Sequence, residues 1–139
     1  MKTLFAFFLL IFALYSAAPA SAAEDTIVSG PRYRTELWNG KILTATFRAG
    51  MCFAPNGYAK GVFILRHSNG DEDVYHVKGH WQNDEFTVEH GSGHKFSGQF
   101  VSDSKIKGKV KLNKGMTLNM SGNRTHNVRL IAHDCAPLK

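Results

Sequence analysis

The chain has 139 residues and a formal net charge of +6, with 43% hydrophobic and 20% charged residues. This length supports one domain, and this composition excludes a disordered or collagen-like chain. Its two cysteines are too few for a small protein whose fold depends on a network of disulfides.

The first 22 residues have the layout of a secretory signal peptide. A basic start at Lys2 is followed by an unbroken apolar run from Leu4 to Tyr15 and by small residues up to Ala22. This run is shorter than the roughly 20 residues that a membrane-spanning helix needs, so we predict cleavage after Ala22 rather than a membrane anchor. The expected product is residues 23–139, a periplasmic or secreted protein with no transmembrane segment.

After a loose lead-in over residues 23–34, short runs alternate between apolar and polar residues. Residues that favour tight turns, namely Gly, Asn, Asp and Ser, separate most of them. The runs span residues 37–48, 61–67, 73–81, 85–90, 94–101, 105–112, 116–121 and 127–133. We predict a single all-β domain over residues 23–139. Its strands form an antiparallel up-and-down meander of about eight strands that closes into a small calycin-like barrel, with a β-sandwich as the alternative.

The pairing of neighbouring runs supports this meander. If residues 85–90 pair with residues 94–101, Val88 faces Phe96, and the next two hairpins also bring apolar residues opposite each other. One face of the sheet is then apolar and the other polar, as expected for a sheet with one face on a core. Gly98 lies on the apolar face, where it bends the strand or makes space for a large neighbour, and both readings favour a filled core.

The two cysteines follow the first and the last predicted runs. An exported protein with two cysteines most simply pairs them. We therefore predict a disulfide between Cys52 and Cys135. It would covalently link the end of the first strand to the end of the last strand, as expected for the closure of an up-and-down barrel.

The meander also contains glycines two residues away from aromatic residues, as in Gly79-His80-Trp81 and Phe96-Ser97-Gly98-Gln99-Phe100. In this general respect it resembles small secreted barrels of the lipocalin or avidin type. The sequence carries none of the diagnostic motifs of those families. The resemblance therefore assigns neither a family nor the role of any residue.

Positive charge is concentrated in the last third of the chain. Residues 95–139 hold nine Lys and Arg against two Asp and Glu, whereas residues 23–94 hold seven against nine. Four lysines alternate along residues 105–112, so on a strand they project from one face, and the predicted pairing adds Lys95 beside Lys111. Such a face attracts polyanions, although lysines on strands also prevent aggregation.

We predict that this face binds an anionic glycan, a lipopolysaccharide or a partner protein. The residues assigned to it are Lys95, Lys107, Lys109 and Lys111. Because the protein is expected to be exported, nucleic acid is not the expected partner.

Five of the histidines lie between His67 and His94. His90 and His94 flank the turn at residues 91–93 and are expected to face each other at the rim of the core. They are the candidates for binding Zn²⁺ or Cu²⁺. No third ligand at a suitable spacing accompanies them, so we assign no metal and no cofactor.

The sequence contains neither the Gly-x-Ser-x-Gly nor the His-Glu-x-x-His signature, and we assign no catalytic residue. The leading hypothesis is an exported, non-enzymatic binding protein that uses the basic strand face. One alternative is a small-ligand carrier or an enzyme that acts at the barrel mouth near Tyr75, His90 and His94. The other is an inhibitor of a secreted hydrolase that docks through residues 56–58.

Overall fold

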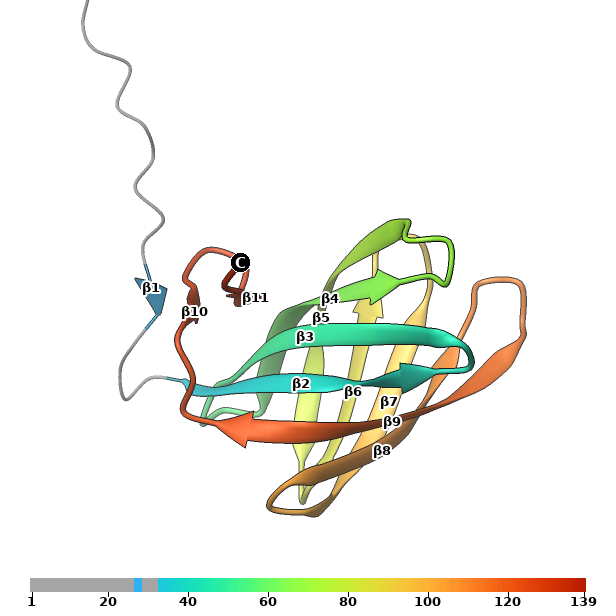
Figure 1. The fold of residues 1–139 in the computed structure, drawn as a ribbon. Coiled ribbons are helices and arrows are strands. Elements are labelled where there is room, and N and C mark those ends of the chain that lie inside the picture. The colour runs from blue at the N-terminus through green and yellow to red at the C-terminus, as the bar shows by residue number, and fades with distance from the viewer. Residues whose placement is uncertain (1–26, 29–32) are drawn as a thin grey trace, which may run out of the picture.

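The computed structural model describes residues 27–28 and 33–139, so the predicted signal peptide lies outside the described residues. Eight consecutive antiparallel strands, β2 to β9, form a closed barrel (Figure 1). Their bounds are β2 Arg34–Ile42, β3 Ala45–Phe53, β4 Tyr58–Arg66, β5 Glu72–Gln82, β6 Glu85–His90, β7 Lys95–Ser102, β8 Lys105–Lys111 and β9 Thr117–His126. The predicted all-β meander and its closure into a barrel are confirmed, and the sandwich alternative is wrong.

Two of the predicted runs have a different place in the fold. Residues 37–48 belong to two strands, because β2 and β3 are joined by a two-residue turn after Ile42, which pairs with Ala45. The turn contains Leu43, at a φ of 55°, and no Gly, Asn or Asp marks it in the sequence. At the other end, residues 127–133 are not a barrel strand. They contain β10 (Leu130–Ile131), which pairs with β1 (Ile27–Val28) and β11 (Ala136–Pro137) in a separate small sheet.

The predicted pairing of the central hairpins is confirmed. Val88 pairs with Phe96, Phe96 with Val110, and Val110 with Leu118. These side chains point into the barrel because successive residues of a strand point to opposite faces. The inner face is therefore the apolar face that the sequence indicates.

Aromatic rings fill the interior of the barrel. Trp38 is fully buried, and its ring centroid lies 4.8–6.0 Å from the centroids of four phenylalanines. These phenylalanines are Phe53, Phe63, Phe86 and Phe100. A Cβ atom on Gly98 would lie 2.6 Å from Cζ of Phe86, so this glycine makes space for a ring. The interior is thus a packed core, which is one of the two states available to an eight-stranded barrel.

The disulfide between Cys52 and Cys135 is present, with the two Cα atoms 5.9 Å apart. It does not close the barrel, however. Closure comes from β2 and β9, which pair from Glu36–His126 to Ile42–Met120. Cys52 points outward from β3, so the disulfide instead fixes the end of the chain to the outside of the barrel.

We call this end of the chain, residues 127–139, the C-terminal strap. It covers the outer surface of β3 and β4, and Figure 1 shows β11 and the C-terminus beside these strands. Gly50 has no side chain at the point where the Cys135 carbonyl lies against it. Leu130 packs beside the disulfide in a second, smaller core. The strap is therefore an integral part of the folded domain.

The disulfide is compatible with an oxidising compartment outside the cytosol. Across residues 27–28 and 33–139, no helix is long and apolar enough to cross a membrane.

Candidate functional site

The lysines of β8 lie on the outside of the barrel, as the sequence predicts. Ile106 and Val110 are buried in the core, and the alternating residues Lys105, Lys107, Lys109 and Lys111 are all exposed. Lys95 on β7 pairs directly with Lys111. The structure therefore brings together the four residues assigned to polyanion binding, Lys95, Lys107, Lys109 and Lys111, with Lys105 beside them.

The positive surface extends across β9 to strands that are not part of the predicted face. Lys107 pairs with Ser121 on β9, and Ser121 pairs on its other side with Lys41 on β2. The same row continues through Thr46 on β3 to Arg66 on β4. A parallel row of paired residues begins at Lys105 on β8. Lys105 pairs with Asn123 on β9, Asn123 pairs with Asn39 on β2, and Asn39 pairs with Arg48 on β3. We call this surface the basic face, formed by Lys41, Arg48, Arg66, Lys95, Lys105, Lys107, Lys109 and Lys111.

Most cations of the basic face have no acidic partner. Within the part of the chain that the structure describes, the single ion pair that involves them joins Lys95 to Glu89, with the Nζ and Oε2 atoms 3.7 Å apart. Arg48 donates a hydrogen bond to the carbonyl of Leu138 in the strap, which is a neutral acceptor. The face therefore presents several positive charges that no carboxylate of the described chain neutralises.

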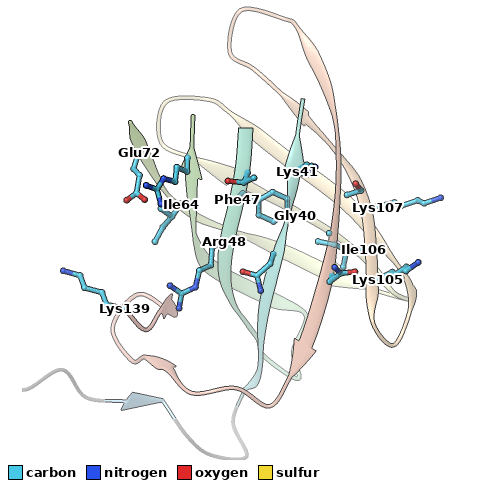
Figure 2. A pocket seen from close by; sticks show the side chains of 16 residues that line it. Gly40, Lys41, Phe47, Arg48, Ile64, Glu72, Lys105, Ile106, Lys107 and Lys139 are labelled. Carbon is cyan, nitrogen blue, oxygen red and sulfur yellow. The ribbon is translucent and has the colours of Figure 1, made fainter. Parts of the chain in front are cut away.

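A hollow of about 980 Å³ lies over the part of the basic face between β8 and β4 (Figure 2). Among the described residues that line it, six are cationic and one, Glu72, is acidic. The cations are Lys41, Arg48, Arg66, Lys105, Lys107 and Lys139. In Figure 2, Glu72 lies at the opposite edge of the hollow from Lys105 and Lys107. Lys139 reaches the hollow from the strap, so the disulfide-anchored end of the chain contributes a charge to this surface.

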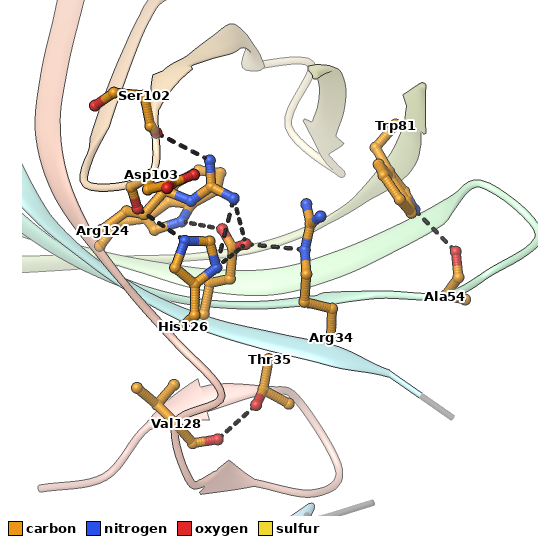
Figure 3. Close-up of polar contacts among 11 residues, drawn as sticks. Arg34, Thr35, Ala54, Trp81, Ser102, Asp103, Arg124, His126 and Val128 are labelled. Atoms are coloured by element: carbon orange, nitrogen blue, oxygen red, sulfur yellow. Dashed lines mark hydrogen bonds and ion pairs between the residues drawn. The ribbon is translucent and has the colours of Figure 1, made fainter. Parts of the chain in front are cut away.

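A second charged cluster lies inside one end of the barrel (Figure 3). Glu36 on β2 is fully buried, and its Oε1 atom lies 2.9 Å from Nε of Arg34 and 3.0 Å from Nη2 of Arg124. Nδ1 of His126 is 3.2 Å from the same oxygen, and the indole of Trp38 donates a hydrogen bond of 2.9 Å to Oε2. We call Arg34, Glu36, Arg124 and His126 the inner cluster.

The inner cluster holds the end of the barrel together. Arg124 donates a hydrogen bond to the carbonyl of Ser102, and the His126 ring contacts the carbonyl of Asp103, so both side chains anchor the turn between β7 and β8. The guanidinium of Arg124 lies 4.0 Å from the Phe100 ring centroid. Arg34 stacks over Trp81 at 4.7 Å. This geometry is that of a structural ion-pair network rather than an open site.

The cluster carries more positive than negative charge. Two guanidinium groups share one carboxylate, and Nη2 of Arg34 and Nε of Arg124 are buried without a hydrogen-bond partner in the described chain. Nε of Arg34 is close enough to Glu36 for an ion pair but not aligned for a hydrogen bond. This cluster was not predicted from the sequence. The signal in the sequence is the polar pair Arg34 and Glu36 at inward positions two residues apart, just before Trp38.

His90 and His94 face each other at the opposite mouth of the barrel, as predicted. Their rings are nearly parallel, with centroids 6.5 Å apart, and Tyr75 stands perpendicular to both. Burial, followed by the adjacent carboxylate of Asp73, raises the pKa of the Tyr75 phenol. The phenol therefore stays protonated near neutral pH and is not an activated nucleophile.

The hydrogen bonds of these two histidines do not favour a metal site. The backbone N–H of Ser92 donates to Nδ1 of His90, and the backbone N–H of Asn113 donates to Nδ1 of His94. A neutral ring that accepts at Nδ1 carries its proton on Nε2, which leaves no lone pair for a metal. Among the residues that the structure describes, no group of three or more His, Cys, Asp or Glu side chains is arranged to hold a metal ion.

The third surface named from the sequence, residues 56–58, forms the turn between β3 and β4. Asn56 accepts a hydrogen bond from the backbone N–H of Tyr58, and the Gly57 carbonyl accepts one from Trp81. The turn is thus held against β5.

The chain matches no protein-family model, no curated protein and no solved structure.

Proposed function

We propose that this protein is an exported, non-enzymatic binding protein that captures an anionic polymer of the cell envelope or its surroundings on the basic face. The observation that supports this proposal is the set of outward-facing cations on β8, β2, β3 and β4, most of which have no acidic residue opposite them, although Arg66 on β4 lies opposite Glu72. Like charges that lie directly opposite each other on adjacent strands, as Lys95 and Lys111 do, cost stability. An anionic partner would offset this repulsion and release counterions.

Two other observations agree with this assignment. The disulfide fits the oxidising compartment that a periplasmic or secreted protein occupies, and the predicted signal peptide would deliver the chain there. The aromatic rings that fill the interior leave the outer surface as the place for a large partner. A carrier of small molecules would need an interior cavity, so we do not propose that alternative.

The test measures binding of the disulfide-bonded protein to two soluble polyanions, heparin and inorganic polyphosphate, with neutral dextran as the reference. We expect binding to at least one polyanion and none to dextran. The double variant Lys107→Glu/Lys109→Glu should raise the Kd at least about tenfold, because it reverses two adjacent charges of the basic face.

The matched control is the double variant Lys60→Glu/Lys78→Glu. These two lysines pair with each other on β4 and β5, outside the basic face, and their reversal changes the net charge by the same amount. We expect this control to alter the Kd less than about threefold. An equal loss of affinity in both variants would show that only net charge matters, and it would overturn the proposed face. Unchanged affinity in the Lys107→Glu/Lys109→Glu variant would overturn it as well. Thermal melting confirms that each variant is folded.

A further inference from the structure

The strand in the middle of the basic face carries no charge on its outer surface. The outward residues of β9 are neutral and polar, and they alternate with inward residues such as Met120 and Arg124. They are Thr117, Asn119, Ser121, Asn123 and Thr125, and all five are exposed. We call them the polar row. It is bordered on one side by the lysines of β8 and on the other by Leu37, Asn39 and Lys41 of β2, with Arg48 beyond Asn39.

The dimensions of this arrangement suit a single extended chain. Neighbouring strands lie about 4.8 Å apart, so the cations of β8 and β2 on either side of β9 are separated by about 10 Å at their backbones. Along the strand, the five members of the polar row cover about 27 Å. Lys107 and Lys41 both pair with Ser121, so this serine lies between two cations. Near Ser121 and Asn123, a polymer that follows β9 would therefore meet hydrogen-bonding groups beneath it and positive charges at both sides, whereas along Thr117 and Asn119 the charges lie on β8 alone.

The side chains of the polar row are free to bind such a polymer. Asn119, Ser121 and Asn123 make no side-chain hydrogen bond to another residue of the described chain. An amide offers both donors and an acceptor, and a hydroxyl offers the same combination. Sugar hydroxyl groups need this combination, whereas sulfate, phosphate and carboxylate groups need Lys and Arg.

We propose that the partner of the basic face is an acidic polysaccharide that lies along β9. Its hydroxyl groups contact the polar row, and its anionic groups contact the cations of β8 on one side and of β2 and β3 on the other. This inference rests on the proposed function, and it adds the chemical class and the direction of the bound chain.

The same surface is less suited to the other common polyanions. The outward positions of β8, β9, β2 and β3 in the described chain hold no aromatic residue, and Phe47 of β3 points into the core. Single-stranded nucleic acids need aromatic rings on which their bases stack. Inorganic polyphosphate has no hydroxyl groups along its chain, so it would leave the polar row unused.

The test compares the triple variant Asn119→Ala/Ser121→Ala/Asn123→Ala with the unmodified protein. All three substitutions leave the net charge unchanged. We expect the Kd for heparin to rise at least about tenfold, since several hydrogen bonds to the sugar are lost. The Kd for inorganic polyphosphate should change less than about twofold, because its contacts are with the lysines.

The matched control is Gln82→Ala/Thr87→Ala, which removes exposed neutral side chains from β5 and β6 and should leave both Kd values unchanged. If the triple variant weakens heparin and polyphosphate equally, or weakens neither, the polysaccharide assignment is overturned while polyanion binding stands. Equal affinity of the unmodified protein for heparin, polyphosphate and single-stranded DNA would also overturn it. If the unmodified protein binds none of these polymers, the proposed function fails as well.

Discussion

Strand β2 carries cations on both of its faces, and their surroundings differ. Arg34 points into the barrel, where the Glu36 carboxylate lies 2.9 Å away, and Arg124 shares the same carboxylate from the closing strand. Lys41 points out toward the polar row and has no ion-pair partner in the described chain. The inner cluster has the features of a structural network, since its carboxylate is fully buried and its cations anchor a turn. The basic face has no buried carboxylate, and among its cations in the described chain only Arg48 donates a hydrogen bond to a backbone carbonyl, that of Leu138.

This comparison separates two reasons for a protein to carry positive charge. A buried cation needs a carboxylate close by because transfer of an unpaired charge from water to the interior is costly. An exposed lysine is hydrated and needs no partner to be tolerated. Positive charges that are adjacent, exposed and unpaired are not needed to balance a buried charge, so they are the ones available for a partner.

The largest expected effect is on the inner cluster. Glu36→Gln keeps an acceptor for the Trp38 indole but leaves two guanidinium groups without a counter-charge, so it should lower the free energy of unfolding by about 3 kcal/mol or more. Urea denaturation measures this change. The control Glu85→Gln removes an exposed carboxylate from β6 and should cost less than about 0.5 kcal/mol. Similar costs for the two variants would remove the distinction between the inner and outer charges.

Salt should act on the two regions differently. Raising NaCl from about 0.05 M to about 0.5 M should weaken polyanion binding at least about tenfold, because binding at the basic face releases counterions. The stability difference between the unmodified protein and Glu36→Gln should change by less than about 0.5 kcal/mol, since buried pairs are screened far less than exposed charges. Titration and urea denaturation at both salt concentrations measure the two responses. A salt-independent affinity would show that the contacts at the face are not ionic.

The smallest expected effect is on stability when a charge of the basic face is reversed. Lys109 has the neutral neighbours Ser97 and Asn119 across the strands, and Lys107 and Lys111 lie two residues away on its own strand. Lys109→Glu should therefore leave the free energy of unfolding unchanged or raise it by up to about 0.5 kcal/mol through relief of repulsion. Urea denaturation measures this value. A loss of about 2 kcal/mol would identify Lys109 as a structural residue instead.

The meander could be predicted from the sequence because the turn residues and the alternation of apolar and polar residues indicate the same strands. The pairs from β5 to β9 follow from hairpins in which each turn is marked by Gly, Asn, Asp or Ser. The β2–β3 turn was not predicted, because Leu43 adopts a positive φ without belonging to a residue type that favours it. Tertiary structure overrides local preference at that position.

Part of the candidate site could be predicted because residues alternate between the two faces of a strand. The lysines of β8 share one strand, so their common direction follows from the alternation of residues. Lys41, Arg48 and Arg66 join them only through the pairing of β2 with β9, which no local pattern indicates. The predicted role of the disulfide in closing the barrel was wrong, because Cys135 lies on the strap and not at the end of a barrel strand. Binding of a polyanion by the basic face stays a prediction.

The ladder between β2 and β9 has a consequence for how the chain reaches its native state. Glu36 pairs with His126, so the first and last barrel strands meet only after nearly the whole domain is available. The Arg124 partner of the Glu36 carboxylate and the Cys135 partner of Cys52 both come from the late part of the chain. Contacts this distant in sequence slow folding, because a long loop must close before they contribute. Until the segment that holds Arg124 and Cys135 is available, the chain would therefore carry an open sheet and a free thiol at Cys52.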